Sequence, residues 1–187
     1  LKNVLNETLP LMEQVQKDLD NLTKNYDIVI ELDEKINTQA KELNKNVNQM
    51  NKDMEELYKL SKNLPSDVTE INQLLKETEA VVNSTNSLVK KLSGSSDSSE
   101  SLTNDLTAIA TETATIGAIV QQTLPTVTDA NAASALMKIG SSANSIGTNL
   151  KSVESTLTEM SSSTLSGTKT LQSNLSKLAD ELHEVSQ

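Results

Sequence analysis

The sequence predicts an all-α protein built as an elongated antiparallel helical hairpin or coiled coil. Leucine, isoleucine, valine and methionine recur at alternating steps of three and four over residues 1–92, which is the spacing that keeps one apolar seam on one side of a helix. The chain has no Phe, Trp or Cys and only two Tyr. The bulky side chains that usually fill a globular core are therefore nearly missing, and narrow helix seams remain as the place for burial.

The first helical arm spans residues 1–92 and carries two apolar rows, in each of which the residues recur every seven positions. We expect both rows to be buried, with Asp33 as a charge in the seam that loosens the helix pair locally or fixes its register. One row runs Leu5, Met12, Leu19, Tyr26, Asp33, Ala40, Val47 and Met54, and the other runs Thr8, Val15, Leu22, Val29, Ile36, Leu43, Met50 and Leu57.

A turn is predicted over residues 93–101, which read Ser-Gly-Ser-Ser-Asp-Ser-Ser-Glu-Ser and have no apolar side chain to bury. Such a composition separates helices. The second helical arm, residues 102–187, has its own apolar stripe, and the register of this stripe shifts by one position between Met160 and Leu171. A shift of this kind locally unwinds a coiled coil.

Pro65 and Pro125 interrupt the two arms at similar distances from the central turn. Proline removes a helix hydrogen bond and clashes with the preceding turn, so it either kinks a helix or begins a new one. In one arrangement, both arms bend at the same level and the two prolines form a hinge. In the other, the prolines separate four helices in a long-short-short-long order, over residues 11–63, 66–92, 101–124 and 127–185.

Ala133, Gly140 and Gly147 are spaced by sevens in the second arm. Small residues at this interval allow two helix backbones to approach closely, and glycine is costly inside a helix unless something compensates. We interpret these residues as a contact face for a partner helix, from the same chain or from a second copy. The alternative is a flexible, poorly packed stretch.

The net charge of −10 argues against nucleic acid as a partner. Residues 1–93 hold 12 Lys against 16 acidic residues, and residues 94–187 hold 4 Lys against 10, so neither half offers the basic face that phosphates require. No apolar run approaches the roughly 20 residues that span a bilayer. Because the helical pattern is already under way at Leu1, we expect any membrane anchor to lie in segments outside this sequence.

His183 is the single histidine and lies in the motif Asp180-Glu181-Leu182-His183-Glu184. A metal site or an acid–base pair needs further converging groups, and the sequence supplies no second histidine. We therefore interpret His183 as an exposed residue near a helix end. We predict no metal, no cofactor and no catalytic residue, so the protein is expected to be non-enzymatic.

Several features resemble the extracellular region of the YhgE/Pip family. They are the Leu-Pro-led helical segments, the Ser/Thr/Asn-rich seams, the glycines at heptad intervals and the segment Leu165-Ser166-Gly167-Thr168-Lys169-Thr170-Leu171-Gln172-Ser173-Asn174-Leu175. Members of this family are phage infection proteins of low-GC Gram-positive bacteria, related to EsaA of type VII secretion and to the phage receptor YueB. The resemblance covers most of the chain and implies a polytopic membrane protein whose helical ectodomain projects through the cell wall.

The functional hypothesis is therefore a helical stalk on the extracellular face of a bacterial membrane. It acts as a docking surface for proteins or phage through its helix faces, and we expect a homodimer. The alternative is the ligand-sensing helical bundle of a chemoreceptor-like signalling protein. Such a bundle should bring polar and charged groups together in a pocket between helices.

Overall fold

The computed structural model describes residues 2–62, 69–93 and 99–186, and these residues form α-helices and one short 3₁₀ helix, with no strand among them. This confirms the all-α class. The two long helices and the two short ones confirm the long-short-short-long order. In chain order the elements are α1 (Lys2–Ser61), α2 (Thr69–Ser93), α3 (Ser99–Thr123), the 3₁₀ helix η1 (Leu124–Thr126) and α4 (Ala130–Ser186).

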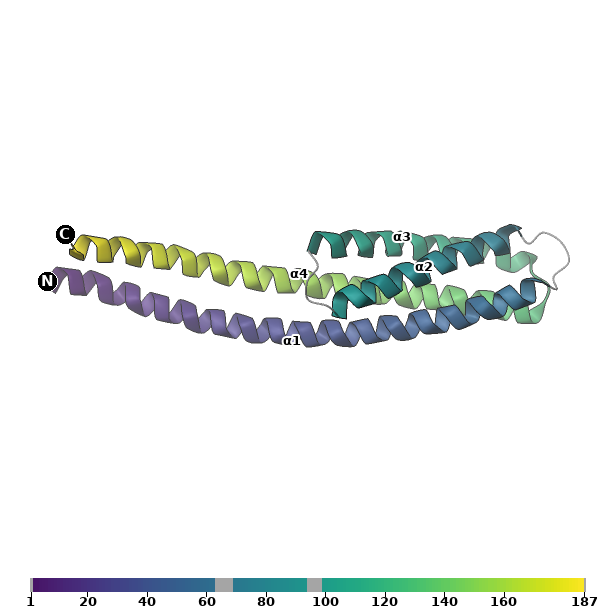
Figure 1. The fold of residues 1–187 in the computed structure, drawn as a ribbon, viewed down its shortest axis with the longest axis horizontal. Helices are drawn as coiled ribbons and strands as arrows, with labels where there is room; N and C mark the ends of the chain where they lie inside the picture. Colours follow the sequence, from purple (N-terminus) through teal and green to yellow (C-terminus); the bar gives the residue numbers. More distant parts are fainter. Residues whose placement is uncertain (1, 63–68, 94–98, 187) are drawn as a thin grey trace. The chain divides into compact units, whose positions relative to one another are not determined.

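The helix bounds also decide between the two arrangements that the prolines allowed. Neighbouring helices run antiparallel, and α2 folds back along α1 instead of continuing it (Figure 1). Neither half of the chain is therefore one continuous arm. Pro65 lies outside the described residues. Pro125 lies in η1, between α3 and α4.

The first helix begins earlier than expected, because α1 starts at Lys2 and contains Pro10. The prolyl nitrogen has no hydrogen to donate to the carbonyl of Asn6, one turn earlier. Both Asn6 and Pro10 are exposed, so water can satisfy that carbonyl group. The helix therefore continues through the proline.

The chain divides into two compact units, each built from both halves of the sequence. Unit 1 comprises residues 1–35 and 156–187, and unit 2 comprises residues 36–155. The helices α1 and α4 each contribute one part to unit 1 and another part to unit 2. Helices α2 and α3 belong wholly to unit 2.

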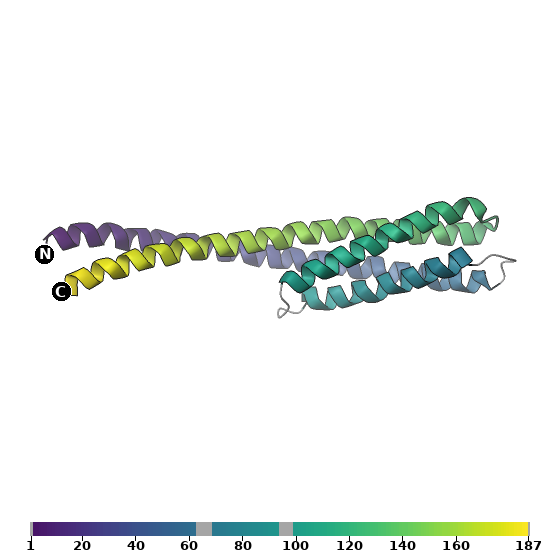
Figure 2. The same ribbon diagram turned by 90° about the horizontal axis from the view of Figure 1, so that it is seen from above.

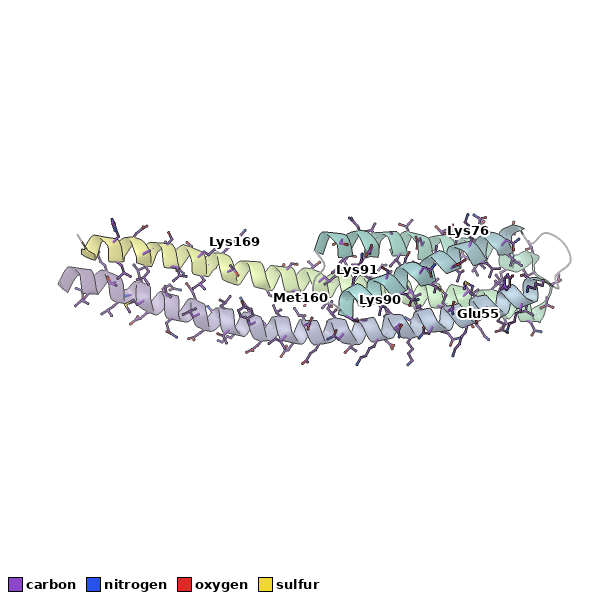
Figure 3. All side chains as sticks on the ribbon, viewed as in Figure 1. Glu55, Lys76, Lys90, Lys91, Met160 and Lys169 are labelled. Carbon is purple, nitrogen blue, oxygen red and sulfur yellow. The ribbon has the colours of Figure 1, made fainter. Side chains whose placement is uncertain are left out.

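Unit 2 is a four-helix bundle with an aliphatic core, and its four helices lie side by side in both views (Figures 1 and 2). Lys91, labelled in Figure 3, ties α2 to α3, since its Nζ lies 2.6 Å from Asp105 Oδ2. The largest fully buried side chains come from all four helices. They are Leu43, Val47, Met50, Leu57, Leu74, Val81, Leu88, Ile109, Ile116, Leu136, Ile139 and Ile146.

Unit 1 is an antiparallel pair of helices with a narrow, partly polar interior. The interior residues follow heptad spacing on α1, and most of them are only half-buried. They are Thr8, Leu11, Val15, Asp18, Leu22, Asn25, Val29 and Leu32 of α1, and Thr156, Leu157, Met160, Ser163, Leu171, Asn174, Leu178 and Glu181 of α4.

The prediction that both apolar rows of the first arm would be buried is wrong in unit 1. Leu5, Met12, Leu19 and Tyr26 are exposed by 44–61%, and Asp33 is exposed as well. Each helix of a two-helix pair can bury only one narrow strip. In unit 2 the same row is covered, and Ala40 and Val47 are buried.

The polar contact in the seam of unit 1 is made by Asp18 and Asn174, and not by Asp33 as the sequence predicted. Asp18 is 4% exposed and accepts hydrogen bonds from Gln14 Nε2 at 3.1 Å and from the side-chain amide of Asn174. The second bond joins α1 to α4 within unit 1. A buried hydrogen-bonded pair at a seam position fixes the register of two helices, so the Asp18–Asn174 pair sets the alignment of α1 against α4 in unit 1.

Candidate functional site: the groove between α3 and α4

An open groove of about 710 Å³ lies between α3 and α4 in unit 2. Most of the side chains that line it are small. They are Leu106, Thr107, Ala110, Thr111, Thr113, Ala114 and Gly117 of α3, and Gly140, Ala143, Asn144, Gly147, Thr148, Leu150, Lys151 and Glu154 of α4. The groove therefore exists because two helices present Ala, Gly and Thr to each other at their line of contact.

Two of the three heptad-spaced small residues lie in this groove and face α3. A Cβ atom added to Gly140 would lie 3.3 Å from Val120 Cγ1, which is tighter than ordinary van der Waals contact. A Cβ atom added to Gly147 would lie 3.7 Å from Thr113 Oγ1. Ala133 is half-buried in the first turn of α4 and does not line the groove. Of the two glycines, Gly140 therefore has the tighter contact with α3, against the side chain of Val120.

Three exposed or half-buried threonines of α3 turn their hydroxyl groups back onto their own helix. Thr107 Oγ1 donates to the carbonyl of Thr103, Thr111 Oγ1 to that of Thr107, and Thr115 Oγ1 to that of Thr111, each at 3.0 Å. Because these hydroxyl hydrogens are already donated to the helix backbone, Thr107 and Thr111 can offer a bound partner methyl groups and hydroxyl acceptors but no hydroxyl donor. The chemistry of the groove is therefore less polar than its sequence indicates.

Charged side chains lie at one end of the groove only. Lys151 and Glu154 of α4 line that end, and the remainder of the lining is uncharged. The groove therefore holds no cluster of acids or bases that could exchange a proton with a substrate or hold a metal ion.

Of the two candidate hinge residues, only Pro125 lies in the described part of the chain. Pro65 lies outside the described residues, whereas Pro125 is exposed in η1. The turn after η1 is closed by a hydrogen bond from the Val127 amide to the Leu124 carbonyl at 3.2 Å. Chain reversal between α3 and α4 therefore takes place around Pro125.

Asp129 is a structural residue that the sequence reading did not single out. Its Oδ1 accepts a hydrogen bond from the Ala132 amide at 2.8 Å, and this side chain caps the first turn of α4. The signal was present, because an aspartate directly before a run of good helix formers is a typical N-cap. The cap defines where α4 begins and hence which of its residues face the groove.

Two carboxyl groups of unit 2 have raised pKa values, and neither lines the groove. Burial raises the pKa of Asp53, while a hydrogen bond from Gln49 and the positive charge of Lys138 partly oppose the shift. Burial also raises the pKa of Glu112, and the negative charge of Glu77 adds to the shift. Both groups are helix-packing residues of the bundle.

His183 is exposed in the last turn of α4. Among the described residues, no group of three or more His, Asp or Glu side chains is placed so that it could hold a metal ion. No helix in the described ranges is long and apolar enough to cross a membrane. Comparison with protein families, curated proteins and solved structures finds no match to this chain.

Proposed function

We propose that the chain is a non-enzymatic helical interaction module from the extracellular part of a bacterial membrane protein. The α3–α4 groove is its docking surface, and the occupant is an α-helix of a protein partner. The observation that carries this proposal is the lining of the groove, in which Gly140, Gly147 and the backbone-bonded threonines of α3 leave an open, weakly polar channel. Helices recognise grooves of this kind by shape and apolar contact.

The extracellular setting is supported by the resemblance to the phage infection proteins, and the geometry of unit 1 fits a membrane-anchored stalk. The beginning of α1 and the end of α4 lie at the same end of that unit (Figures 1 and 2). Segments that flank the chain on both sides would therefore leave from neighbouring points, as a stalk carried on one membrane requires. In this setting the partner is a secretion component or a phage protein.

The absence of cysteine from the chain allows a direct test. Ala114→Cys places one thiol in the groove, and Ser87→Cys places one on the exposed face of α2. Intact cells that carry the whole membrane protein are treated with a membrane-impermeant maleimide. We expect both thiols to react from outside the cell, and we expect Ala114→Cys to react about tenfold more slowly in cells than in purified protein, because bound helix excludes the reagent.

Two outcomes would contradict the proposal in different ways. Labelling of both variants only after the cells are broken would rule out the extracellular location. For each variant, the labelling rate in cells is divided by the labelling rate in purified protein. If this ratio is the same for Ala114→Cys and Ser87→Cys, the groove is empty in its native setting. In that case the docking role would be wrong even with the protein outside the cell.

A ligand-sensing bundle is the second candidate, and the volume of the groove favours it, because small-molecule sites occupy roughly 300–1,000 Å³. Lys151 is the positive group available there for an acidic ligand. The same thiol separates the candidates. If small molecules from the culture medium protect Ala114→Cys in the purified protein, the sensor is favoured, and if protection requires macromolecules, the docking surface is favoured.

A further inference from the structure

Unit 1 exposes a strip of large apolar side chains along one side of α1. The strip consists of Leu5, Leu9, Met12, Leu19, Tyr26 and Ile30, which are exposed by 44–61%. Four of them share the heptad row of Leu5, and the other two share the row of Leu9. Exposed apolar residues scattered singly need no explanation, but a strip with helical spacing marks an interaction surface.

The helix α4 continues this apolar surface on the same flank of unit 1. On α1, Met12, Leu19 and Tyr26 each directly follow an interior residue, and on α4, Leu175 and Leu182 directly follow the interior residues Asn174 and Glu181. In an antiparallel pair of right-handed helices, the positions just after interior residues lie on the same side of both helices. Leu175 and Leu182 are exposed by 44% and 50%, so the strip and these two leucines form one apolar face.

The opposite flank of unit 1 is mostly polar. The positions just before interior residues are Glu7, Gln14, Asn21 and Ile28 on α1, and Thr170 and Lys177 on α4. Only Ile28 among them is a large apolar residue. The contrast between the two flanks shows that the apolar face is specific to one side.

The covered part of the same heptad row indicates which kind of structure fits this face. Ala40 and Val47, which continue the row of Leu5 into unit 2, are 3% and 1% exposed, and α1 packs there against α2 of the antiparallel α2–α3 pair. Unit 1 itself contains parts of α1 and α4 and no part of α2 or α3. A second antiparallel helix pair would cover the apolar face in the same way, and unit 1 of another molecule is itself such a pair with a matching apolar face.

We propose that two copies of the chain associate through these faces, so that two unit 1 helix pairs form an intermolecular four-helix bundle around a twofold axis. A twofold interface places the same surface of each copy against the other. Eight side chains that are each about half exposed hold an apolar area on the order of the ~800 Å² per partner that stable interfaces bury. The proposal concerns unit 1 alone and does not depend on the groove of unit 2.

The charge of unit 1 gives the association a characteristic salt dependence. Unit 1 holds 6 Lys against 12 acidic residues, for a net charge of −6. Two such units repel each other, and added salt screens the repulsion. Self-association should therefore tighten as salt increases, whereas binding of a basic partner to the same face should weaken.

The test measures the monomer–dimer equilibrium of the whole chain by sedimentation, at low and at high salt. Leu19→Glu places a charge on the apolar face, and Asn21→Glu places the same charge on the polar flank of the same helix turn. Both positions are exposed, so neither change disturbs a buried residue, and circular dichroism checks the helix content. We expect a dimer that tightens with salt, a loss of affinity of at least about tenfold in Leu19→Glu, and a change of less than about threefold in Asn21→Glu.

A second measurement uses Tyr26, which belongs to the apolar face. Tyr58→Phe leaves Tyr26 as the single tyrosine of a chain without Trp, so its fluorescence reports on this face alone. Quenching by acrylamide should fall as protein concentration rises through the dimerisation range. A chain that stays monomeric at high salt, an equal effect of both glutamate variants, or quenching independent of concentration would each overturn the proposal.

Discussion

At the scale of single residues, Asp53 combines burial with incomplete hydrogen bonding. It is 3% exposed, its Oδ1 accepts a hydrogen bond from Gln49 Nε2 at 3.1 Å, and its Oδ2 is buried with no partner in the structure. Burial raises its pKa above the ordinary value of 3.8. The folded protein therefore binds a proton at Asp53 more readily than the unfolded chain does.

This raised pKa gives a prediction about stability and pH. The stabilising contribution of the protonated Asp53 is fully present below pH 3.8 and is lost as pH rises through the raised value. The Asp53→Asn variant has no carboxyl group to titrate at this position. Between acidic and neutral pH, the free energy of unfolding of the variant should therefore fall less than that of the unmodified protein. At pH 7 we expect the variant to be more stable by about 1 kcal/mol, because an incompletely bonded buried charge is gone.

Urea unfolding at several pH values measures both quantities. Glu55→Gln is the matched control, because Glu55 lies on the same helix and is exposed (Figure 3). If the free energy of unfolding depends on pH in the same way in the unmodified protein and in Asp53→Asn, the raised pKa of Asp53 is contradicted.

The sequence did not reveal which carboxylates are buried. Heptad counting gave Asp33 a seam position, yet the structure exposes Asp33 and buries Asp18 and Asp53. The reason is that one interior row of α1, which runs Leu11, Asp18, Asn25 and Leu32, is half polar, and apolar content alone does not show that a neighbouring helix covers it. Burial of a given row is decided by the surrounding helices.

At the scale of helices, the hydrogen bond from Asn174 to Asp18 links α4 to α1 in unit 1. Asn174→Leu removes a donor from the buried carboxylate and should lower the free energy of unfolding of unit 1 by about 1–3 kcal/mol. The double variant Asp18→Leu/Asn174→Leu should recover most of this loss, because an apolar pair needs no hydrogen bond.

A double-mutant cycle measured by urea unfolding gives the coupling between the two residues. Asn149→Leu changes a half-buried asparagine elsewhere on α4 and serves as the control. Losses that simply add in the double variant would show that the two side chains do not act as a pair.

Helix positions were largely predictable from sequence. The expected ranges 66–92, 101–124 and 127–185 correspond to α2 at Thr69–Ser93, α3 at Ser99–Thr123 and α4 at Ala130–Ser186. Proline and serine-rich segments mark these ends by local chemistry. The sequence could not predict that α2 folds back along α1 instead of continuing it, because the apolar seam has the same periodicity in both cases. The groove was equally hidden, although Gly140 and Gly147 marked one of its walls.

At the scale of the whole molecule, the two units differ in how completely their interior side chains are buried and in how polar those side chains are. Unit 2 holds every fully buried large side chain of the core, whereas the interior of unit 1 is mostly half-buried and includes Asp18, Asn25 and Asn174. Local opening is easier where few apolar contacts oppose it. Stability should therefore change along α1, a single helix that contributes to both units.

Hydrogen exchange followed by mass spectrometry checks this expectation within one helix. Backbone amides in residues 36–61 of α1 should exchange at least about tenfold more slowly than those in residues 5–35. Uniform protection along α1 would contradict it. Within α1, raising the protein concentration should slow exchange only in residues 5–35, since the proposed dimer forms through unit 1.

The threonines of α3 have a consequence for how a bound helix would be selected. Their hydroxyl groups are committed to carbonyls of their own helix, so recognition in the groove would depend on contour rather than on matched polar groups. Loss or gain of a single methyl group on either side would then change affinity. Exchanges among Ser, Ala and Thr could thus redirect the protein from one partner to another while leaving the bundle core intact.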